Sequence, residues 1–281
     1  MYDFKQVKVD NKSIKEVSYL LSHVFTSTNK FTKEFIEWQY AENPNGSIVG
    51  FNAFAGEELA AHYVTQPVEV ELKGEKLRGL LSLNTATHPD HRGKKLFTKL
   101  AELTYEYAKN NGYKFVYGVA NDNSTHGFVN KLGFQLVSPL KTKIGFGKII
   151  HKRNVIDYDF KRVWTQEDLK WRLNNPSLKY YINKNQLIVP TGKIGLNAIM
   201  YNFDDNQIIE NTLTENFKGL NILKLYVGID NSIDWKKSFY FDVPKRFKSS
   251  PLNLIFKDLR NKGTTIHPKK IKFEIIDFDG Y

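Results

Sequence analysis

Six residues between a strand-like stretch and a helical pattern carry the clearest chemistry in this sequence: Asp90-His91-Arg92-Gly93-Lys94-Lys95. A helix that begins here leaves its first backbone N–H groups without intrahelical partners, and its dipole favours negative charge at that end. Gly93 allows the backbone to approach a ligand closely, and the arginine and the two lysines add three cations. The pattern predicts a phosphate or pyrophosphate site, although an ordinary basic turn would have the same composition.

The elements around this loop have regular spacing. In residues 94–111, Leu96, Leu100, Leu103 and Tyr107 repeat on one helical face, and Gly112 follows where a left-handed cap is expected. A strand-like run at 77–87 precedes the loop, and another at 113–120 follows the helix. Strand, loop, helix and strand at this spacing predict a crossover between two parallel strands.

The rest of the chain alternates between the same two patterns. We expect helices at 11–24, 31–40, 124–132 and 251–261, the last from Leu252, Ile255, Phe256 and Leu259. We expect further strands at 47–55, 59–71, 180–189, 194–201, 220–229, 237–243 and 271–278. This order predicts an α/β or α+β fold with a mixed, twisted central sheet flanked by helices.

Two segments resemble the signatures of the GNAT superfamily of N-acetyltransferases. His88-Pro89-Asp90-His91-Arg92-Gly93-Lys94-Lys95-Leu96-Phe97 resembles the acyl-CoA-binding motif, in which an Arg/Gln-x-x-Gly-x-Gly/Ala loop wraps the CoA pyrophosphate. Asn121-Asp122-Asn123-Ser124 follows the second strand, and the segment from Phe128 to Phe134 resembles the family's Tyr-x-Lys-x-Gly-Phe ending. The resemblance covers residues 1–150 and is strongest over 80–134.

The resemblance implies acetyl-CoA as co-substrate and a set of residues that bind it. Backbone N–H groups near Thr85–Thr87 would hold the pantetheine arm and polarise the thioester carbonyl. Lys95 and Phe97 depart from the motif, because they occupy its two glycine positions. The implied cofactor-binding residues are Thr85, Ala86, Thr87, Arg92, Gly93, Lys94, Lys95, Leu96, Phe97, Thr98, Asn123 and Phe128.

The catalytic groups implied by the resemblance are harder to assign. Many relatives carry a general-acid tyrosine where this chain has Val129, so Tyr117 on the second strand is the best replacement acid. His126 and Asp122 lie nearest the cofactor loop in sequence and are our first candidates for the base. Further candidates for the base are His62, His88 and Glu42. Taken alone, each of these candidates for the base fits a structural or surface role better than a catalytic one.

The second half contains an echo of the first. Thr, Glu and Trp coincide between the segments Phe31–Trp38 and Trp164–Trp171, and Asn43-Pro44 and Asn175-Pro176 follow them. A duplicated fold unit explains this better than chance. We therefore expect an acetyl-CoA-binding domain at 1–150 and a second, degenerate GNAT-like domain at 151–281 that shapes the acceptor site. The aromatic residues Trp38, Tyr40, Trp171 and Tyr180 would either stack on an acceptor or belong to the core.

Composition limits the alternatives. The chain has 281 residues, a formal net charge of +11 spread over both halves, and no cysteine. The absence of cysteine excludes a thiolate metal site and a cysteinyl intermediate, and we expect no metal. No apolar run reaches the length of a membrane span, so we expect a cytoplasmic protein. The oligomeric state stays open.

The leading hypothesis is an acetyl-CoA-dependent N-acetyltransferase that acts on the primary amine of a small, anionic acceptor such as a nucleotide-linked amino sugar. A non-catalytic acyl-CoA-binding or regulatory module is the alternative, favoured by Lys95, Phe97 and Val129. A basic nucleic-acid-binding protein fits less well, because the sequence shows no helix-turn-helix, zinc or RNP signature and no charged stripe.

Overall fold

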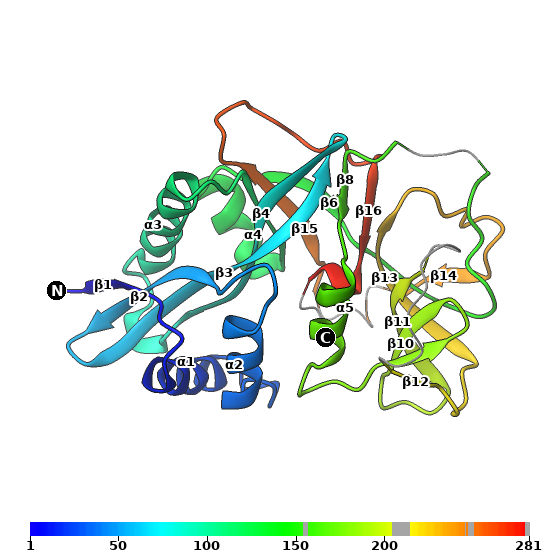
Figure 1. The fold of residues 1–281 in the computed structure, drawn as a ribbon, viewed down its shortest axis with the longest axis horizontal. Coiled ribbons are helices and arrows are strands. Elements are labelled where there is room, and N and C mark those ends of the chain that lie inside the picture. Colours follow the sequence, from blue (N-terminus) through cyan, green and yellow to red (C-terminus); the bar gives the residue numbers. More distant parts are fainter. Residues whose placement is uncertain (154–156, 204–213, 245, 247–249, 279–281) are drawn as a thin grey trace.

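A single mixed β-sheet of 16 strands extends through both halves of the molecule (Figure 1). The computed structural model describes residues 1–153, 157–203, 214–244, 246 and 250–278. The sheet contains antiparallel and parallel pairs and is flanked by few helices, which confirms the predicted fold class. No helix of the described residues is both long and apolar enough to cross a membrane.

The first half builds one arm of this sheet, with strands in the order β1-β2-β3-β4-β5 and with β15 and β6 beyond β5. Its elements are β1 (Asp3–Gln6), α1 (Asn11–Val24), α2 (Lys33–Ala41), β2 (Val49–Ala55), β3 (Glu58–Leu72), β4 (Glu75–Thr87), a 3₁₀ turn (Pro89–His91), α3 (Leu96–Asn110), β5 (Phe115–Ala120), α4 (Asp122–His126), a π turn (Gly127–Lys131) and β6 (Gln135–Pro139). The predicted crossover is present: β4, α3 and β5 follow one another, and the two strands are parallel.

The second half builds the other arm. Its elements are β7 (Lys141–Gly145), β8 (Phe160–Arg162), α5 (Gln166–Leu173), β9 (Tyr181–Asn183), β10 (Gln186–Pro190), β11 (Leu196–Asn202), β12 (Glu215–Asn216), β13 (Leu223–Asp230), β14 (Tyr240–Asp242), β15 (Asn253–Asp258), β16 (Ile271–Glu274) and a 3₁₀ turn (Ile275–Asp277). β9, β10 and β11 form an antiparallel meander, and β11 then pairs in parallel with β13. This repeats the order of β2 to β5.

The helix expected at 251–261 is wrong, because residues 253–258 form the strand β15 between β5 and β6. Leu254, Ile255 and Phe256 are consecutive and all buried, as in a strand covered on both faces. The apolar residues at positions 252, 255, 256 and 259 have the spacing of one helical face, and this spacing led to the wrong prediction. β15 follows the expected boundary at residue 150 in sequence but pairs with strands of the first half, so the chain returns to that half. The division into two domains stays a prediction.

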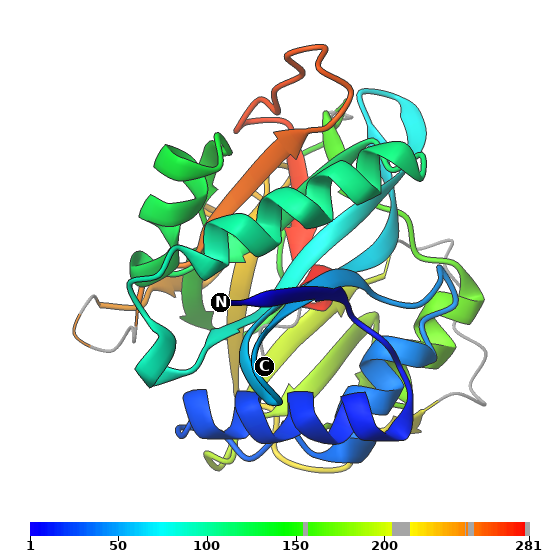
Figure 2. The same cartoon turned by 90° about the vertical axis from the view of Figure 1, so that its left-hand side faces the viewer.

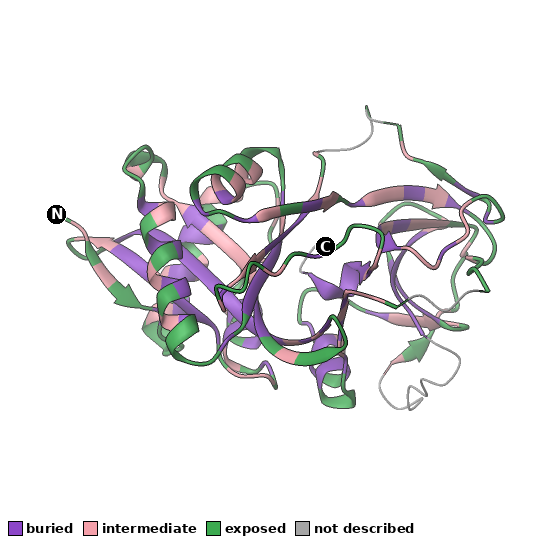
Figure 3. Cartoon of the chain, turned by 90° about the horizontal axis from the view of Figure 1, so that it is seen from above, coloured by how far each residue is buried: buried purple, intermediate pink, exposed green. Residues whose placement is uncertain are grey.

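Helices cover both faces of the first arm (Figure 2). Leu96, Leu100 and Ala108 of α3 pack on one face with Tyr63 and Val116. Residues of α1 and α2, among them Val17, Leu21 and Phe35, form a second core with Val64 and Ala86. A third cluster of buried residues follows the central strands from one arm into the other (Figure 3). The two halves share this part of the core.

The two echoed segments meet where the halves join. The Trp38 and Trp171 rings stack with centroids 4.7 Å apart and planes at 12°. Each indole Nε1 donates to the backbone oxygen of the other tryptophan, at 2.9 Å and 3.2 Å. Thr32 and Thr165 cap α2 and α5 in the same way. These tryptophans are therefore core residues in the described structure, each 6% exposed or less.

Candidate functional site

The site begins where β4 and β5 separate. Within the described chain these parallel strands are hydrogen-bonded over three residue pairs, which end at Ser82↔Gly118. Beyond this point β4 continues to Thr87 and β5 to Ala120. Backbone N–H and C=O groups need partners, so the separating strands offer hydrogen-bonding edges to a molecule between them.

A β-bulge lies on the β4 side of this gap. The register between β3 and β4 shifts between His62 and Val64, so that Asn84 and Thr85 lie across from Tyr63 alone. Asn84 has a left-handed backbone with φ of 47°. Its Nδ2 donates to Gln39 Oε1 at 2.5 Å and to the Tyr40 hydroxyl at 3.2 Å, which ties the bulge to α2.

The basic loop and the first turn of α3 enclose a cavity of about 220 Å³ next to the gap. Lys95 is the N-cap of α3 with a left-handed φ of 58°, and Gly93 is also left-handed, with φ of 76°. Lys95 gives the helix no side-chain capping bond, and the residues of the first turn, Leu96, Phe97 and Thr98, line the cavity. The cavity is lined by Thr87, His91, Arg92, Gly93, Lys94, Lys95, Leu96, Phe97, Thr98 and Lys131.

This arrangement suits a phosphate group. Backbone N–H groups at a helix N-terminus and several cations around one cavity are the features that bind phosphates. The loop residues expected from the sequence, Arg92 to Thr98, line the cavity together with Thr87. Lys131 lines it as well and was not expected. Its position in the Lys-Leu-Gly-Phe ending of the second motif was the available signal.

The two departures from the glycine pattern have structural explanations. Lys95 keeps the left-handed backbone that a glycine would adopt there. The Phe97 ring lies against Gly127, where a Cβ atom would be 3.0 Å from the ring, and packs edge-on against Phe128 at 5.1 Å. The bulky side chain is therefore accommodated by a glycine in the second motif.

The structure does not bring the three expected catalytic residues to one point. Tyr117 is fully buried in the shared core, and its hydroxyl donates to the backbone oxygen of Asp277 at 2.9 Å. Burial raises the pKa of Tyr117 well above its ordinary value. Asp122 and His126 are exposed at the two ends of α4. Among the other expected residues, Thr85 is half-buried beside the bulge, Ala86 is buried, and Asn123 is exposed.

A chain of hydrogen-bonded, mostly buried polar side chains leads from Asn52 to the bulge at Asn84. His62 is fully buried, with Nδ1 2.6 Å from Asn52 Oδ1 and Nε2 2.8 Å from the Tyr40 hydroxyl, which Asn84 also contacts. Burial lowers the pKa of His62 to about 3, so the imidazole is neutral at physiological pH. His62 therefore holds Tyr40 and the bulge in place and is a poor proton acceptor.

A second chain of hydroxyls begins at the base of the gap. Ser82, the last paired residue of β4, lies 2.9 Å from the Tyr63 hydroxyl, which is 2.6 Å from that of Tyr105. Burial raises the pKa of Tyr63 to about 12 and that of Tyr105 well above its ordinary value, so both phenols stay protonated. No motif marked these residues, because the chain joins side chains from β3, β4 and α3.

Comparison with known proteins agrees with this geometry. Residues 7–137 match the family model of the acetyltransferase (GNAT) domain. No protein of curated function matches the sequence.

Several solved structures have a similar fold over most of the chain. A probable N-acyltransferase from Enterococcus faecalis aligns with a TM-score of 0.61 at 12% identity, over 92% of this chain and 73% of that one. A GCN5-related N-acetyltransferase from Anabaena variabilis gives 0.59, also at 12% identity and with the same coverage of both chains. The N-myristoyltransferase of Saccharomyces cerevisiae, with myristoyl-CoA bound, gives 0.56 at 12% identity over 91% and 82%. At this identity the similarity establishes the fold alone.

Proposed function

Because residues 7–137 of this chain match the family model of the GNAT acetyltransferase domain, we propose that the protein transfers an acetyl group from acetyl-CoA directly to the primary amine of a small acceptor. The acyltransferase class and the acyl-CoA co-substrate follow from the family. The acceptor, the transferred acetyl group and the residue roles below are proposals.

One observation carries the proposal: the gap between β4 and β5 opens beside the cavity at the start of α3. The pyrophosphate would bind at the start of α3, near Arg92, Lys95 and Lys131. The pantetheine arm would lie between the separated strands, with hydrogen bonds to the edge of β4 at Thr85–Thr87. The thioester then reaches the bulge at Asn84, where a backbone N–H can stabilise the developing oxyanion.

The reaction needs two proton movements. The neutral amine nitrogen attacks the thioester carbonyl carbon, a C–N bond forms, and the C–S bond breaks. The amine loses one proton to a base, and the departing CoA thiolate takes up one proton. Cysteine is absent from the sequence, so the transfer has no cysteinyl intermediate.

Different residues serve these two steps in our proposal. Ser82 is the donor nearest the base of the gap, and its hydroxyl is backed by Tyr63 and Tyr105. We place the acid there and not at Tyr117, whose hydroxyl is engaged with Asp277. His126 and Asp122 remain the candidates for the base, because α4 directly follows β5 and exposes both side chains at that end of the gap.

The acceptor we propose is anionic, for example a nucleotide-linked amino sugar. The net charge of +11 favours the approach of such a molecule over that of a cationic amine. The second half, which shares the core with the first, would shape the acceptor side of the gap.

Calorimetric titration with acetyl-CoA tests the first step. We expect the wild-type protein to bind, and Arg92→Ala to weaken binding about 10-fold or more, the value of one charge-assisted hydrogen bond. Lys99→Ala is the matched control, because Lys99 is exposed on α3 but does not line the cavity. Absence of binding by the wild-type protein would refute the proposal.

A thiol-release assay tests the second step. A panel of amines that differ only in a phosphate group should give faster release with the phosphorylated members, and Ser82→Ala should lower kcat with little change in the KM for acetyl-CoA. Binding of acetyl-CoA without turnover of any amine would instead favour a non-catalytic module, the reading supported by Val129 at the usual acid position.

A further inference from the structure

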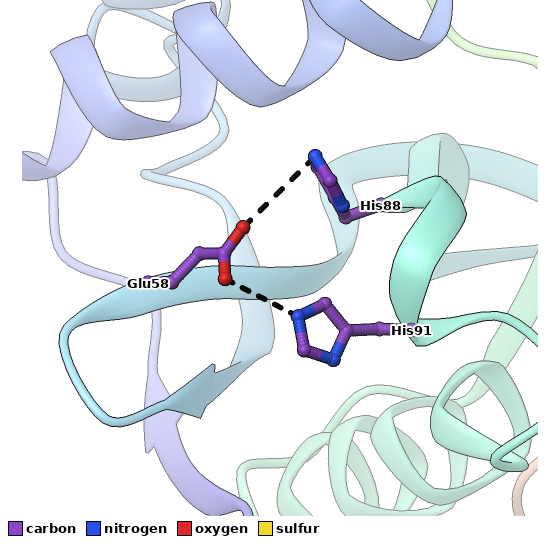
Figure 4. A group of neighbouring side chains, drawn as sticks. All are labelled: Glu58, His88 and His91. Carbon is purple, nitrogen blue, oxygen red and sulfur yellow. Dashed lines mark hydrogen bonds and ion pairs between the residues drawn. The ribbon is translucent and has the colours of Figure 1, made fainter.

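Three side chains with metal-ligating atoms converge beside the basic loop of residues 92–95, which we call the phosphate loop (Figure 4). One of them, His91, also lines the cavity described above. Glu58 is the first residue of β3, His88 follows the end of β4, and His91 ends the 3₁₀ turn. One ligand atom from each lies within 4.8 Å of the other two. Glu58 and His91 are 33 residues apart in sequence, so no spacing motif indicated this cluster.

We propose that Glu58, His88 and His91 bind one divalent transition-metal ion of the zinc type, which ties the β2–β3 turn to the loop that precedes Arg92. Two imidazoles and one carboxylate, with open positions for water, form a common ligand set for such ions. Magnesium and calcium prefer all-oxygen sites, so the two histidines favour the zinc type.

The distance from Glu58 to His91 already fits a shared ion, whereas the distance to His88 is longer. Glu58 Oε2 lies 3.3 Å from His91 Nε2, and Glu58 Oε1 lies 3.9 Å from His88 Nε2. Ligands about 2.0–2.2 Å from a tetrahedral zinc ion are about 3.3–3.5 Å from each other. Both imidazoles turn the same nitrogen, Nε2, toward the carboxylate (Figure 4), so an ion needs only a small contraction of the cluster.

Neighbouring groups already hold both rings in this orientation. The Tyr2 hydroxyl lies 2.8 Å from His91 Nδ1, and the His23 ring stacks on His88 with centroids 4.9 Å apart and planes at 5°. Asp90 Oδ2 lies 3.8 Å from His88 Nδ1. When a metal binds Nε2 of His88, the imidazole proton lies on Nδ1. Nδ1 then no longer accepts the long 3.4 Å contact from the Asp90 amide and can donate to the Asp90 carboxylate instead.

The cluster is accessible and its position has a consequence. The side chains of His88 and His91 are 17% and 13% exposed and that of Glu58 is 54% exposed, so an ion can enter and keep water ligands. His88 N donates to Ala60 O at 2.9 Å, which links the same two segments. Because His91 directly precedes Arg92, the ion would restrict the start of the phosphate loop and add positive charge beside it.

Metal content measured on tag-free full-length protein tests the proposal. After equilibration with Zn²⁺ and removal of free ion, we expect one Zn²⁺ per chain by plasma mass spectrometry. His91→Ala and Glu58→Gln should each lower the affinity at least 10-fold, and Tyr2→Phe should lower it about 10-fold through the lost contact to Nδ1. Zn²⁺ should also raise the thermal midpoint of the wild-type protein but not that of His91→Ala.

Two matched variants control for adventitious binding. Glu57→Gln removes the neighbouring exposed carboxylate, and His126→Ala removes an exposed histidine on α4; both should bind Zn²⁺ like the wild type. Absorption of the Co²⁺-loaded protein should show imidazole–carboxylate coordination that disappears in His88→Ala. Failure of the wild type to retain Zn²⁺, or equal retention by all variants, would refute a metal site at Glu58, His88 and His91.

Discussion

Gly93 and Lys95 both adopt left-handed backbone conformations in the phosphate loop, but only one of them is a glycine. A left-handed conformation costs an ordinary residue about 1–2 kcal/mol, and Lys95 retains this cost beside a cavity lined by further cations. Strain of this kind persists where the surrounding structure imposes it, and it gathers at ligand-binding loops. We therefore attribute the presence of a lysine at this strained position to its positive charge.

Two substitutions separate the strain from the charge. Lys95→Gly should raise the free energy of unfolding by about 1 kcal/mol, because glycine adopts this backbone without a Cβ clash. Lys95→Ala keeps the strain and should not stabilise the protein. Both variants lose the cation and should bind acetyl-CoA about 10-fold more weakly. Urea unfolding and calorimetry measure the two effects; tighter binding by Lys95→Gly would contradict the role of the charge.

His62 makes stability depend on pH. A histidine in an unfolded chain titrates near pH 6.5, whereas burial lowers the pKa of His62 to about 3 in the folded protein. Between these values the unfolded state binds more protons, so the free energy of unfolding falls as the pH falls, by up to about 1.4 kcal/mol per pH unit.

The expected loss from His62 is about 2 kcal/mol between about pH 6.5 and pH 5. Urea unfolding at these two pH values should show a smaller decrease in the free energy of unfolding for His62→Gln than for the wild type. Each protein is compared with its own stability at the higher pH. An equal pH dependence in both proteins would mean that His62 titrates normally when folded.

At the scale of elements, the bulge in β4 lies directly beyond the last residue pair that β4 forms with β5. Asn84 has a left-handed φ of 47° and joins the bulge to α2 through Gln39 and Tyr40. Asparagine tolerates this conformation, whereas β-branched residues resist it. The bulge therefore depends on the residue type at position 84.

Asn84→Val should lower the free energy of unfolding by about 1–3 kcal/mol and weaken acetyl-CoA binding. Asn84→Gly is the matched control: it removes the same side-chain contacts but adopts the left-handed backbone, so it should keep most of the binding. Calorimetry and urea unfolding of both variants test this. Equal weakening of binding in Asn84→Gly and Asn84→Val would show that the lost side-chain contacts matter and the backbone conformation does not.

Local patterns predicted the elements whose chemistry is local. Helix α3 and the strands before and after it were expected within two residues of their bounds, because caps, turns and periodicity are properties of neighbouring residues. β15 was mistaken for a helix, since burial on both faces removes the alternation of a half-exposed strand. The short strands β6, β7 and β8 were not anticipated. The hydroxyl chain of Ser82, Tyr63 and Tyr105 could not be predicted from the sequence, because it forms only when three elements pack together.

At the scale of the whole molecule, the pseudo-symmetric contact of Trp38 and Trp171 joins the two halves. The rings stack, and each donates a hydrogen bond to the other's backbone. The sequence predicted that these segments were related; it did not predict that they touch. Internal similarity predicts a repeated unit but contains no information on how the two copies are placed.

A double-mutant cycle measures this contact. Trp38→Leu and Trp171→Leu each remove one ring of the stack together with its indole donor. Because the two residues contact each other directly, their effects on the free energy of unfolding should be coupled by about 1 kcal/mol or more. Strict additivity of the two single changes would mean that the stack contributes nothing to holding the halves together.

The position of β15 in the chain has a consequence for synthesis. β5 forms one wall of the gap, and its outer edge is covered by a strand that the ribosome makes more than 130 residues later. Until that strand emerges, β5 and β6 expose unpaired edges, and the nascent amino-terminal part cannot complete its own sheet. A working gap can therefore form only after residue 258 has been made, and a fragment that stops at residue 150 would leave the ribosome as an aggregation-prone, incomplete sheet.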